Sequence, residues 1–173
     1  MPYQIELRFG LLTGLLISAY ILTEFFLGFH TTHFEMGKIS EYFSGIIPLI
    51  TYFFALKQKQ KEDFQGSMTF VNGVISGLLV TVVTGLVLVV FFALYNTVIN
   101  PGYTETGIVY ETAKLKQQGI ADSTIARFMT EYRQKIGLGN TLFMVFFGTL
   151  VQGALISMIL TPIVIWKKKR AGN

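Results

Sequence analysis

The sequence has no cysteine and few charged residues. Without a cysteine among its 173 residues, the chain can form neither disulfide bonds nor thiolate-based metal and nucleophile sites. Charged side chains make up only 14% of the residues and hydrophobic ones 51%, a balance far from that of a soluble domain of this length. These features indicate an integral membrane protein.

The sequence also lacks the motifs of common enzyme classes. It has no glycine-rich phosphate loop followed by lysine, no HExxH metal motif and no credible set of Ser, His and Asp. The two histidines stand close together, and Asp63 and Asp122 fall on opposite sides of the predicted membrane. We therefore expect a non-enzymatic protein without a cofactor.

Four apolar runs are long enough to cross a membrane, which takes about 20 helical residues. They lie at 7–29, 39–56, 69–96 and 141–166. The second is the shortest and contains Pro48, but a neighbouring helix can satisfy the backbone that a proline frees. The sequence predicts an all-α integral membrane protein with a single membrane domain, residues 1–173, built as a four-transmembrane-helix bundle. The first span is expected to stay as an anchor.

Basic residues predict the orientation of the spans. The N-terminus, the 57–68 connection and the C-terminus share one side, which holds Arg8, Lys57, Lys59, Lys61, Lys167, Lys168, Lys169 and Arg170. Because loops rich in Lys and Arg stay in the cytoplasm, we expect both termini to be cytoplasmic. Topology and contact with anionic membrane lipid explain the net charge of +4, so no nucleic-acid partner is expected.

Small residues recur at every fourth position of the spans. The stripes contain Gly10, Gly14 and Ser18 in the first span, Gly73, Gly77, Thr81 and Gly85 in the third, and Gly153 and Ser157 in the fourth. Helices in lipid associate through close packing, which small residues allow, so the stripes predict helix-packing faces. A homodimer formed through Gly73 and Gly77 is the alternative. Helical counting places Val80 on the opposite side of the third span.

A long connection, residues 97–140, joins the third and fourth spans. After Asn100 and Pro101 stop the third span, one helix is predicted up to Gly119, and a second helix follows. The second helix has an amphipathic face formed by Ile125, Phe128, Met129, Tyr132 and Ile136. This helical extracytoplasmic loop can cap the bundle, lie on the membrane or use the face to bind a partner.

Three segments carry a resemblance to a known family. They are GSMTFVNGVISG at the start of the third span, NPGY at its end and QQGI between the two loop helices. With them, nearly the whole chain resembles an uncharacterised domain-of-unknown-function family of small four-helix bacterial inner-membrane proteins. The resemblance implies a multi-pass protein of the bacterial inner (cytoplasmic) membrane. It also implies association with envelope enzymes such as polyprenyl-phosphate glycosyltransferases, and it supplies no catalytic residues.

Ionisable residues gather at the end of the first span. Glu24 is followed by HTTHFE, which contains His30, His33 and Glu35. Helical counting puts Glu24 on the packed face, where an intramembrane carboxylate is a candidate functional group. Its height of about 26 Å above Leu7, however, places it near the wet edge of the apolar core. The cluster is a candidate proton or cation site, a hydrated surface cluster, or a metal site, although its residue spacing is not that of a recognised metal-binding motif.

Two functions follow from these observations. The first is a non-enzymatic accessory or scaffold subunit that holds or regulates another envelope protein, which accounts for the missing catalytic set and the long loop. The second is a small proton- or cation-coupled transporter or channel, with a homodimer as one form of it and Glu24 as its coupling group. Small multidrug transporters also have four spans and a carboxylate in the first. We favour the first, because the spans offer no polar path across the membrane.

Overall fold

A computed structural model describes residues 3–171, with the side chains of residues 134 and 167–171 left undescribed. Over this range the chain is helical, and no strand occurs within it. The helices are α1 (Gln4–Phe26), α2 (Phe34–Ser44), α3 (Ile46–Glu62), α4 (Phe70–Leu94), the π-helix η1 (Tyr95–Ile99), α5 (Tyr103–Gln117), α6 (Asp122–Lys135) and α7 (Leu138–Ala171).

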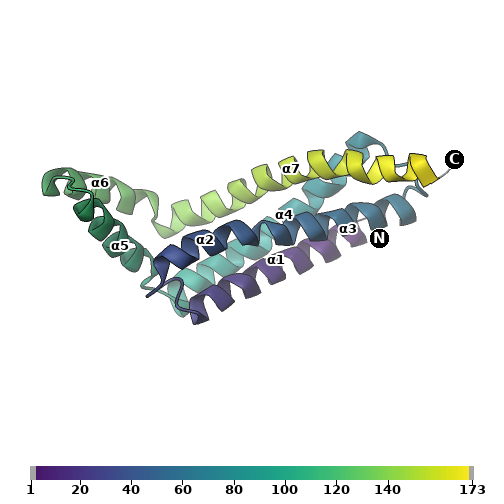
Figure 1. The fold of residues 1–173 in the computed structure, drawn as a ribbon. Coiled ribbons are helices and arrows are strands. Elements are labelled where there is room, and N and C mark those ends of the chain that lie inside the picture. The colour runs from purple at the N-terminus through teal and green to yellow at the C-terminus, as the bar shows by residue number, and fades with distance from the viewer. Residues whose placement is uncertain (1–2, 172–173) are drawn as a thin grey trace.

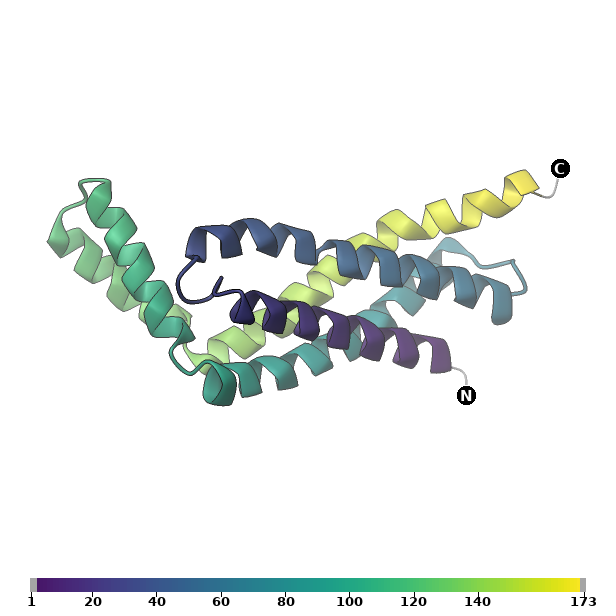
Figure 2. The ribbon, with the colours of Figure 1, turned by 60° about the horizontal axis from the view of Figure 1, so that its bottom comes forward.

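Helices α1, α2–α3, α4 and α7 form an elongated bundle, and α5 and α6 form a hairpin that projects from one end of it (Figure 1). Both ends of the chain lie at the opposite end of the bundle (Figures 1 and 2). We call the two ends the hairpin end and the terminal end.

Four segments are long and apolar enough to cross a membrane: Gln4–Phe26, Phe34–Glu62, Phe70–Ile99 and Leu138–Trp166. This confirms the prediction of four such helices. Many large apolar side chains on them are exposed, including Leu15, Phe54 and Val90. Water would not tolerate so extensive an apolar surface, whereas lipid covers it readily. The arrangement is that of a multi-pass membrane protein.

The second span is broken. α2 ends at Ser44 and α3 begins at Ile46, with Gly45 between them. Pro48 has no N–H to donate to the carbonyl of Ser44, and its ring would clash with that carbonyl in a continuous helix. The helix therefore breaks one turn before the proline. The predicted run over 39–56 missed this break and ended short of Glu62.

Helix α4 packs closely against α7 through small residues. A methyl group added at Gly77 would overlap Ser157, and one added at Gly73 would overlap Thr161. Gly153 of α7 leaves space for α4 in the same way. The backbones of the two helices can approach this closely only because these positions carry little or no side chain.

Helix α1 packs against another side of α4. Ideal Cβ atoms at Gly10 and Gly14 would lie 2.5 Å and 2.6 Å from the Cβ atoms of Val83 and Val87. Thr84 also donates a hydrogen bond of 3.2 Å to the carbonyl of Gly10. The small residues of α1 therefore accommodate the valines of α4, so α4 is in tight contact on two sides.

Two sequence expectations change with this arrangement. Gly73 and Gly77 face α7, so the surface considered for a homodimer is occupied within the chain. Val80, expected on the side away from the packed face, is fully buried in a core shared by α3, α4 and α7. Because three helices surround α4, a division into one packed side and one free side does not describe it.

A buried ion pair joins α1 to α3 at the terminal end. Lys59 Nζ lies 2.7 Å from a carboxylate oxygen of Glu6 and 2.6 Å from one of Asp63. Ser76 donates a hydrogen bond of 2.9 Å to the same Glu6 oxygen. The sequence analysis placed Lys59 among the free basic residues of a loop, but α3 continues past Leu56 and buries it. Breaking a buried pair of this kind typically costs about 3–5 kcal/mol.

The α5–α6 hairpin has a small core of its own. Ile108 of α5 is buried with Ile125 and Met129 of α6, and Leu115, Tyr132 and Ile136 pack around them. This core uses most of the amphipathic face that was a candidate for partner binding. Phe128 alone among that face's five residues is exposed, at 50%. The face is therefore the inside of the hairpin, which rules out the alternative in which it is an open partner-binding surface.

Aromatic and charged contacts fix the hairpin to α2. Phe34 stacks on the rings of Tyr103 and Tyr110 of α5, with centroids 6.3 Å and 5.1 Å away. Lys38 pairs with Glu111 of α5. The hairpin is thus anchored on one helix of the bundle by stacking and by charge.

We predict that Gly77→Ala lowers the free energy of unfolding by about 1–3 kcal/mol, the usual cost of overpacking, because its methyl group would displace α7. Gly148→Ala is the matched control, since a Cβ there meets nothing within 4 Å and alanine favours the helix. Thermal unfolding of the purified variants in detergent measures both. Equal effects of the two changes would contradict the close α4–α7 contact.

Candidate functional site

A tight turn after α1 brings His30 back towards Glu24. Gly28 adopts a φ of +77°, a conformation that a residue with a side chain rarely takes. Its carbonyl accepts hydrogen bonds from the backbone N–H groups of Thr31, Thr32 and His33. The turn closes on itself in this way, and His30 projects from it onto the hairpin end of the bundle.

The end of α4 supplies the second wall of the site. Its last turn widens into the π-helix Tyr95–Ile99, and the N–H of Asn100 bonds to the carbonyl of Tyr95 at 2.7 Å. π-Helical turns often occur at functional sites because they redirect side chains. Tyr95 is 1% exposed and lies between α1 and the turn that carries His30.

A chain of hydrogen bonds sets the tautomer of His30. Asn100 Nδ2 donates to the hydroxyl of Tyr95 at 3.2 Å, and this hydroxyl lies 2.5 Å from His30 Nδ1; its own proton is satisfied when it donates to that nitrogen. The neutral imidazole then carries its proton on Nε2. That nitrogen faces Glu24 Oε2 at 3.6 Å. The network therefore presents an N–H to a carboxylate inside the bundle.

Glu24 is buried. It is 4% exposed, and its Oε1 has no hydrogen-bond partner. The helical count correctly pointed it into the bundle, but the expectation of a hydrated carboxylate at the membrane edge is wrong. The turn 27–33 and the end of α4 cover it, and neither could be placed from the height of Glu24 along α1.

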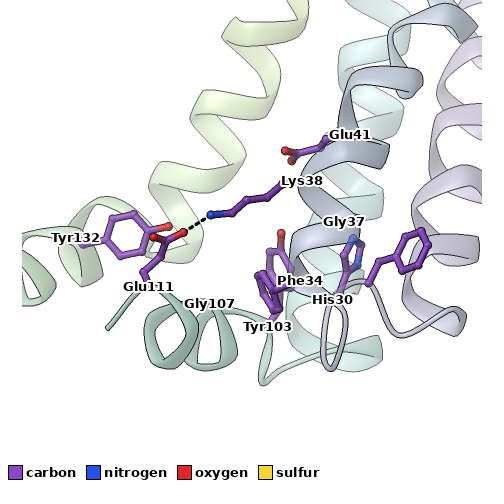
Figure 3. A pocket seen from close by; sticks show the side chains of 10 residues that line it. His30, Phe34, Gly37, Lys38, Glu41, Tyr103, Gly107, Glu111 and Tyr132 are labelled. Carbon is purple, nitrogen blue, oxygen red and sulfur yellow. Dashed lines mark hydrogen bonds and ion pairs between the residues drawn. The ribbon is translucent and has the colours of Figure 1, made fainter. Parts of the chain in front are cut away.

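Two adjoining cavities of about 190 Å³ each open from this cluster. His30, Glu41 and Tyr103 line both of them. One extends inward past Glu24. The other, whose lining residues are drawn in Figure 3, extends outward under the hairpin to Lys38 and Glu111. We call the two cavities together the hairpin-end pocket.

The pocket is acidic. Glu24, Glu41 and Glu111 line it, and the ammonium of Lys38 is paired with Glu111. Burial lowers the pKa of His30, and the negative charge of Glu41 opposes this effect only in part. Burial, reinforced by Glu41, raises the pKa of Tyr103 to about 12. At neutral pH the neutral His30 therefore adds no positive charge, and the pocket suits a proton or a cationic group.

The structure brings together only part of the predicted proton or cation site. Glu24 and His30 share the hairpin-end pocket, whereas His33 is exposed. Glu35 accepts a hydrogen bond from Tyr110 in a separate groove beside α5. Among the residues that the structure describes, no three His, Asp or Glu side chains are placed to hold a metal ion.

Sequence reasoning missed Glu41, Tyr95, Asn100 and Tyr103. Glu41 carried a usable signal, because it is a carboxylate within a predicted span. Asn100 and Tyr103 belong to the NPGY stop and Tyr95 lies five residues before it, but a pattern of turn residues does not show which side chains fold back into the bundle. Their role depends on the π-helical turn, for which the sequence has no clear signature.

Comparison with known proteins gives a family for the chain. A family model described as "Protein of unknown function (DUF4199)" matches residues 8–164. The chain belongs to this family. The assignment confirms the resemblance seen in the sequence and covers all four membrane-length helices. No curated protein and no solved structure gave a significant match.

We predict that His30 makes folding stability pH-dependent. The pKa of folded His30 lies below the unfolded value of about 6.5. The contribution of neutral His30 to the free energy of unfolding is therefore fully present above pH 6.5. It falls as the pH drops towards the folded pKa, by up to about 1.4 kcal/mol per pH unit. Thermal unfolding between pH 7.5 and 5 tests this. His30→Gln should flatten the slope and the exposed control His33→Gln should not; identical slopes in all three proteins would contradict a buried neutral His30.

Proposed function

We propose that the protein is a non-enzymatic membrane scaffold, or accessory subunit, that holds another envelope protein against α7. The observation that carries the proposal is an unfilled face of α7 at the hairpin end. Here α7 packs on α4 and makes no comparable contact with α2, and its residues Met144, Phe147 and Val151 are exposed. A helix with an open face inside a membrane bundle has room for one more helix.

The residues on this face suit another helix better than lipid. Gln152 lies at the midpoint of the span Leu138–Trp166 and is exposed. Its Nε2 lies 3.9 Å from the Cβ position of Gly45, so the amide faces the α2–α3 break, and no hydrogen bond joins it to another described residue. An unpaired amide in hydrocarbon costs about 2–7 kcal/mol, and transmembrane helices often satisfy such groups by pairing with each other. One turn earlier, Gly148 has no neighbour within 4 Å of its Cβ position. A glycine beside an unpaired amide fits the close approach of a partner helix.

The partner proposed is a transmembrane helix of an envelope enzyme, and a polyprenyl-phosphate glycosyltransferase is the first candidate because of the implied association. The acidic hairpin-end pocket would receive a basic residue at the end of that helix, since Glu24 and Glu41 there lack a basic partner other than His30 among the described residues. The hairpin, anchored to α2, holds this end of the bundle in place.

We further propose that the protein lies in the bacterial inner membrane with both termini in the cytoplasm. Charge supports this orientation. At the hairpin end, six basic residues are widely spaced along the chain, and three of them, Lys38, Lys116 and Arg133, are paired with carboxylates. At the terminal end, Lys57 and Lys61 are exposed, and the basic run KKKR occupies positions 167–170 directly after the fourth span. Lys and Arg clustered close to the ends of the spans favour the cytoplasmic side.

Labelling of single-cysteine variants tests the orientation cleanly, because the chain has no cysteine of its own. Ser123 in the hairpin and Ser67 in the α3–α4 connection are both exposed. We expect Ser123→Cys to react with a membrane-impermeant maleimide added to intact spheroplasts. Ser67→Cys should react only after the membrane is permeabilised. The reverse pattern would invert the proposed topology.

A second candidate function, proton or cation transport, is favoured by one observation: the buried carboxylate of Glu24 has an unpartnered oxygen next to a cavity. Against it, the tight contacts of Gly10 with Val83 and of Gly14 with Val87 close the bundle below that cavity. The purified protein in liposomes should therefore carry no flux that Glu24→Gln abolishes. Flux that depends on Glu24 would replace the scaffold proposal with the transporter.

Crosslinking and one substitution test the scaffold itself. In the native host, we expect a photoreactive residue at position 152 to crosslink one other envelope protein. The same probe at Val90, which is 62% exposed on α4, should give no such product. Gly148→Leu should remove the Gln152 crosslink by filling the open face while leaving thermal stability unchanged. Val151→Leu, which places the same leucine side chain at an exposed neighbouring position, should retain the crosslink.

Other outcomes of the crosslinking experiment overturn this proposal. A product of twice the protein's own mass would show that a second copy fills the face. If only lipid adducts form at Gln152, or if Gly148→Leu leaves the crosslinked partner unchanged, the face has no protein partner.

A further inference from the structure

A second cavity, at the terminal end, lies between α3, the α3–α4 connection and α7. It has a volume of about 450 Å³, within the range of small-molecule sites. Its walls are formed by Phe53, Lys57, Gln60, Lys61, Gln65, Gly66 and Val164. We call it the α3–α7 groove. It is remote from the hairpin-end pocket and from the open face of α7.

The polar groups of the groove include the hydrogen-bond donors that an anion needs. Lys57 and Lys61 are exposed, and neither is paired with a carboxylate of the described residues. Gln60 is 8% exposed, and its Nε2 is buried without a hydrogen-bond partner. A buried, unpaired donor costs about 1–3 kcal/mol. A ligand oxygen that reaches Gln60 would remove that cost.

The groove changes from apolar to basic along one face of α3. Phe53, Lys57 and Lys61 follow one another at four-residue intervals, which spreads them over about 12 Å of helix. Phe53 lies towards the middle of the bundle and the lysines lie towards its terminal end, while Val164 of α7 lines the groove from the other side. This order matches a phospholipid whose acyl chain lies along the apolar wall and whose phosphate lies between the two ammonium groups.

We infer that the α3–α7 groove binds an anionic phospholipid, with Lys57, Lys61 and Gln60 holding the headgroup phosphate. Basic pockets between transmembrane helices are a known means of binding anionic headgroups. The charge of the groove selects against zwitterionic lipid, and its apolar wall selects against free phosphate. The inference needs membrane insertion but not the proposed protein partner.

Thermal unfolding of the full chain in mixed micelles tests the inference, with phosphatidylglycerol, phosphatidylcholine or inorganic phosphate as the added probe. We expect saturable stabilisation by phosphatidylglycerol alone. The double change Lys57→Gln with Lys61→Gln should weaken the apparent affinity about thirtyfold, from roughly 1 kcal/mol per lysine. Lys114→Gln with Lys116→Gln removes the same charge from α5 and should leave the affinity unchanged.

Gln60→Leu separates a ligand-binding role from a structural one. Replacing a buried, unpaired amide by an apolar group of similar size should leave the lipid-free protein as stable or make it more stable. The same change should lower the stabilisation by phosphatidylglycerol. A loss of lipid-free stability with unchanged lipid response would overturn the role of Gln60. Equal stabilisation by phosphatidylcholine or inorganic phosphate, or an equal response in both lysine double variants, would overturn the site.

Discussion

The fold depends on the close approach of α4 to two neighbours at once. Lipid tails are as apolar as leucine, so helices in a membrane gain little from burying apolar surface and must gain from contact instead. Glycines provide that contact on both sides, with Gly77 of α4 against α7 and Gly10 of α1 against α4. Once α4 is held between them, α3 completes a core around Val80 and Leu56. Helix α2 continues from α3, and the α5–α6 hairpin is anchored on α2 by the contacts of Phe34 and Lys38.

The same constraint explains which parts of the fold were predictable. Long apolar runs and four-residue spacing of small residues are local patterns, so the four spans and the packed faces could be inferred from them. The break at Gly45 follows from Pro48 and could have been predicted from the sequence. The burial of Lys59 could not, because it depends on Glu6, which is 53 positions earlier in the chain, and on how far α3 continues past its apolar run.

The hairpin-end pocket shows a similar division. The direction of Glu24 came correctly from helical periodicity, whereas its burial depends on a turn and a π-helical segment that fold over it. In the hairpin, the amphipathic face of α6 was a real signal, but periodicity shows only that a face is buried and not against what. Ile108 of α5 covers it. A local sequence pattern shows which residues are buried, but it does not identify the distant or irregular segments that cover them.

Polar side chains occur along the whole interior, yet they do not form a path across it. In the middle of the bundle Thr13 bonds to Thr51, and Tyr52 bonds to Thr81. Thr13 and Thr81 also bond to carbonyls one turn earlier in their own helices. Such hydroxyls are already satisfied, and they tie helices together instead of passing a proton on. In the middle of the bundle these hydroxyls therefore satisfy one another, and the buried side-chain atoms without a partner, among them Glu24 Oε1 and Gln60 Nε2, lie towards its two ends. The proposed partner and lipid sites accordingly lie at the ends and on the surface of the bundle, and not along a polar path through it.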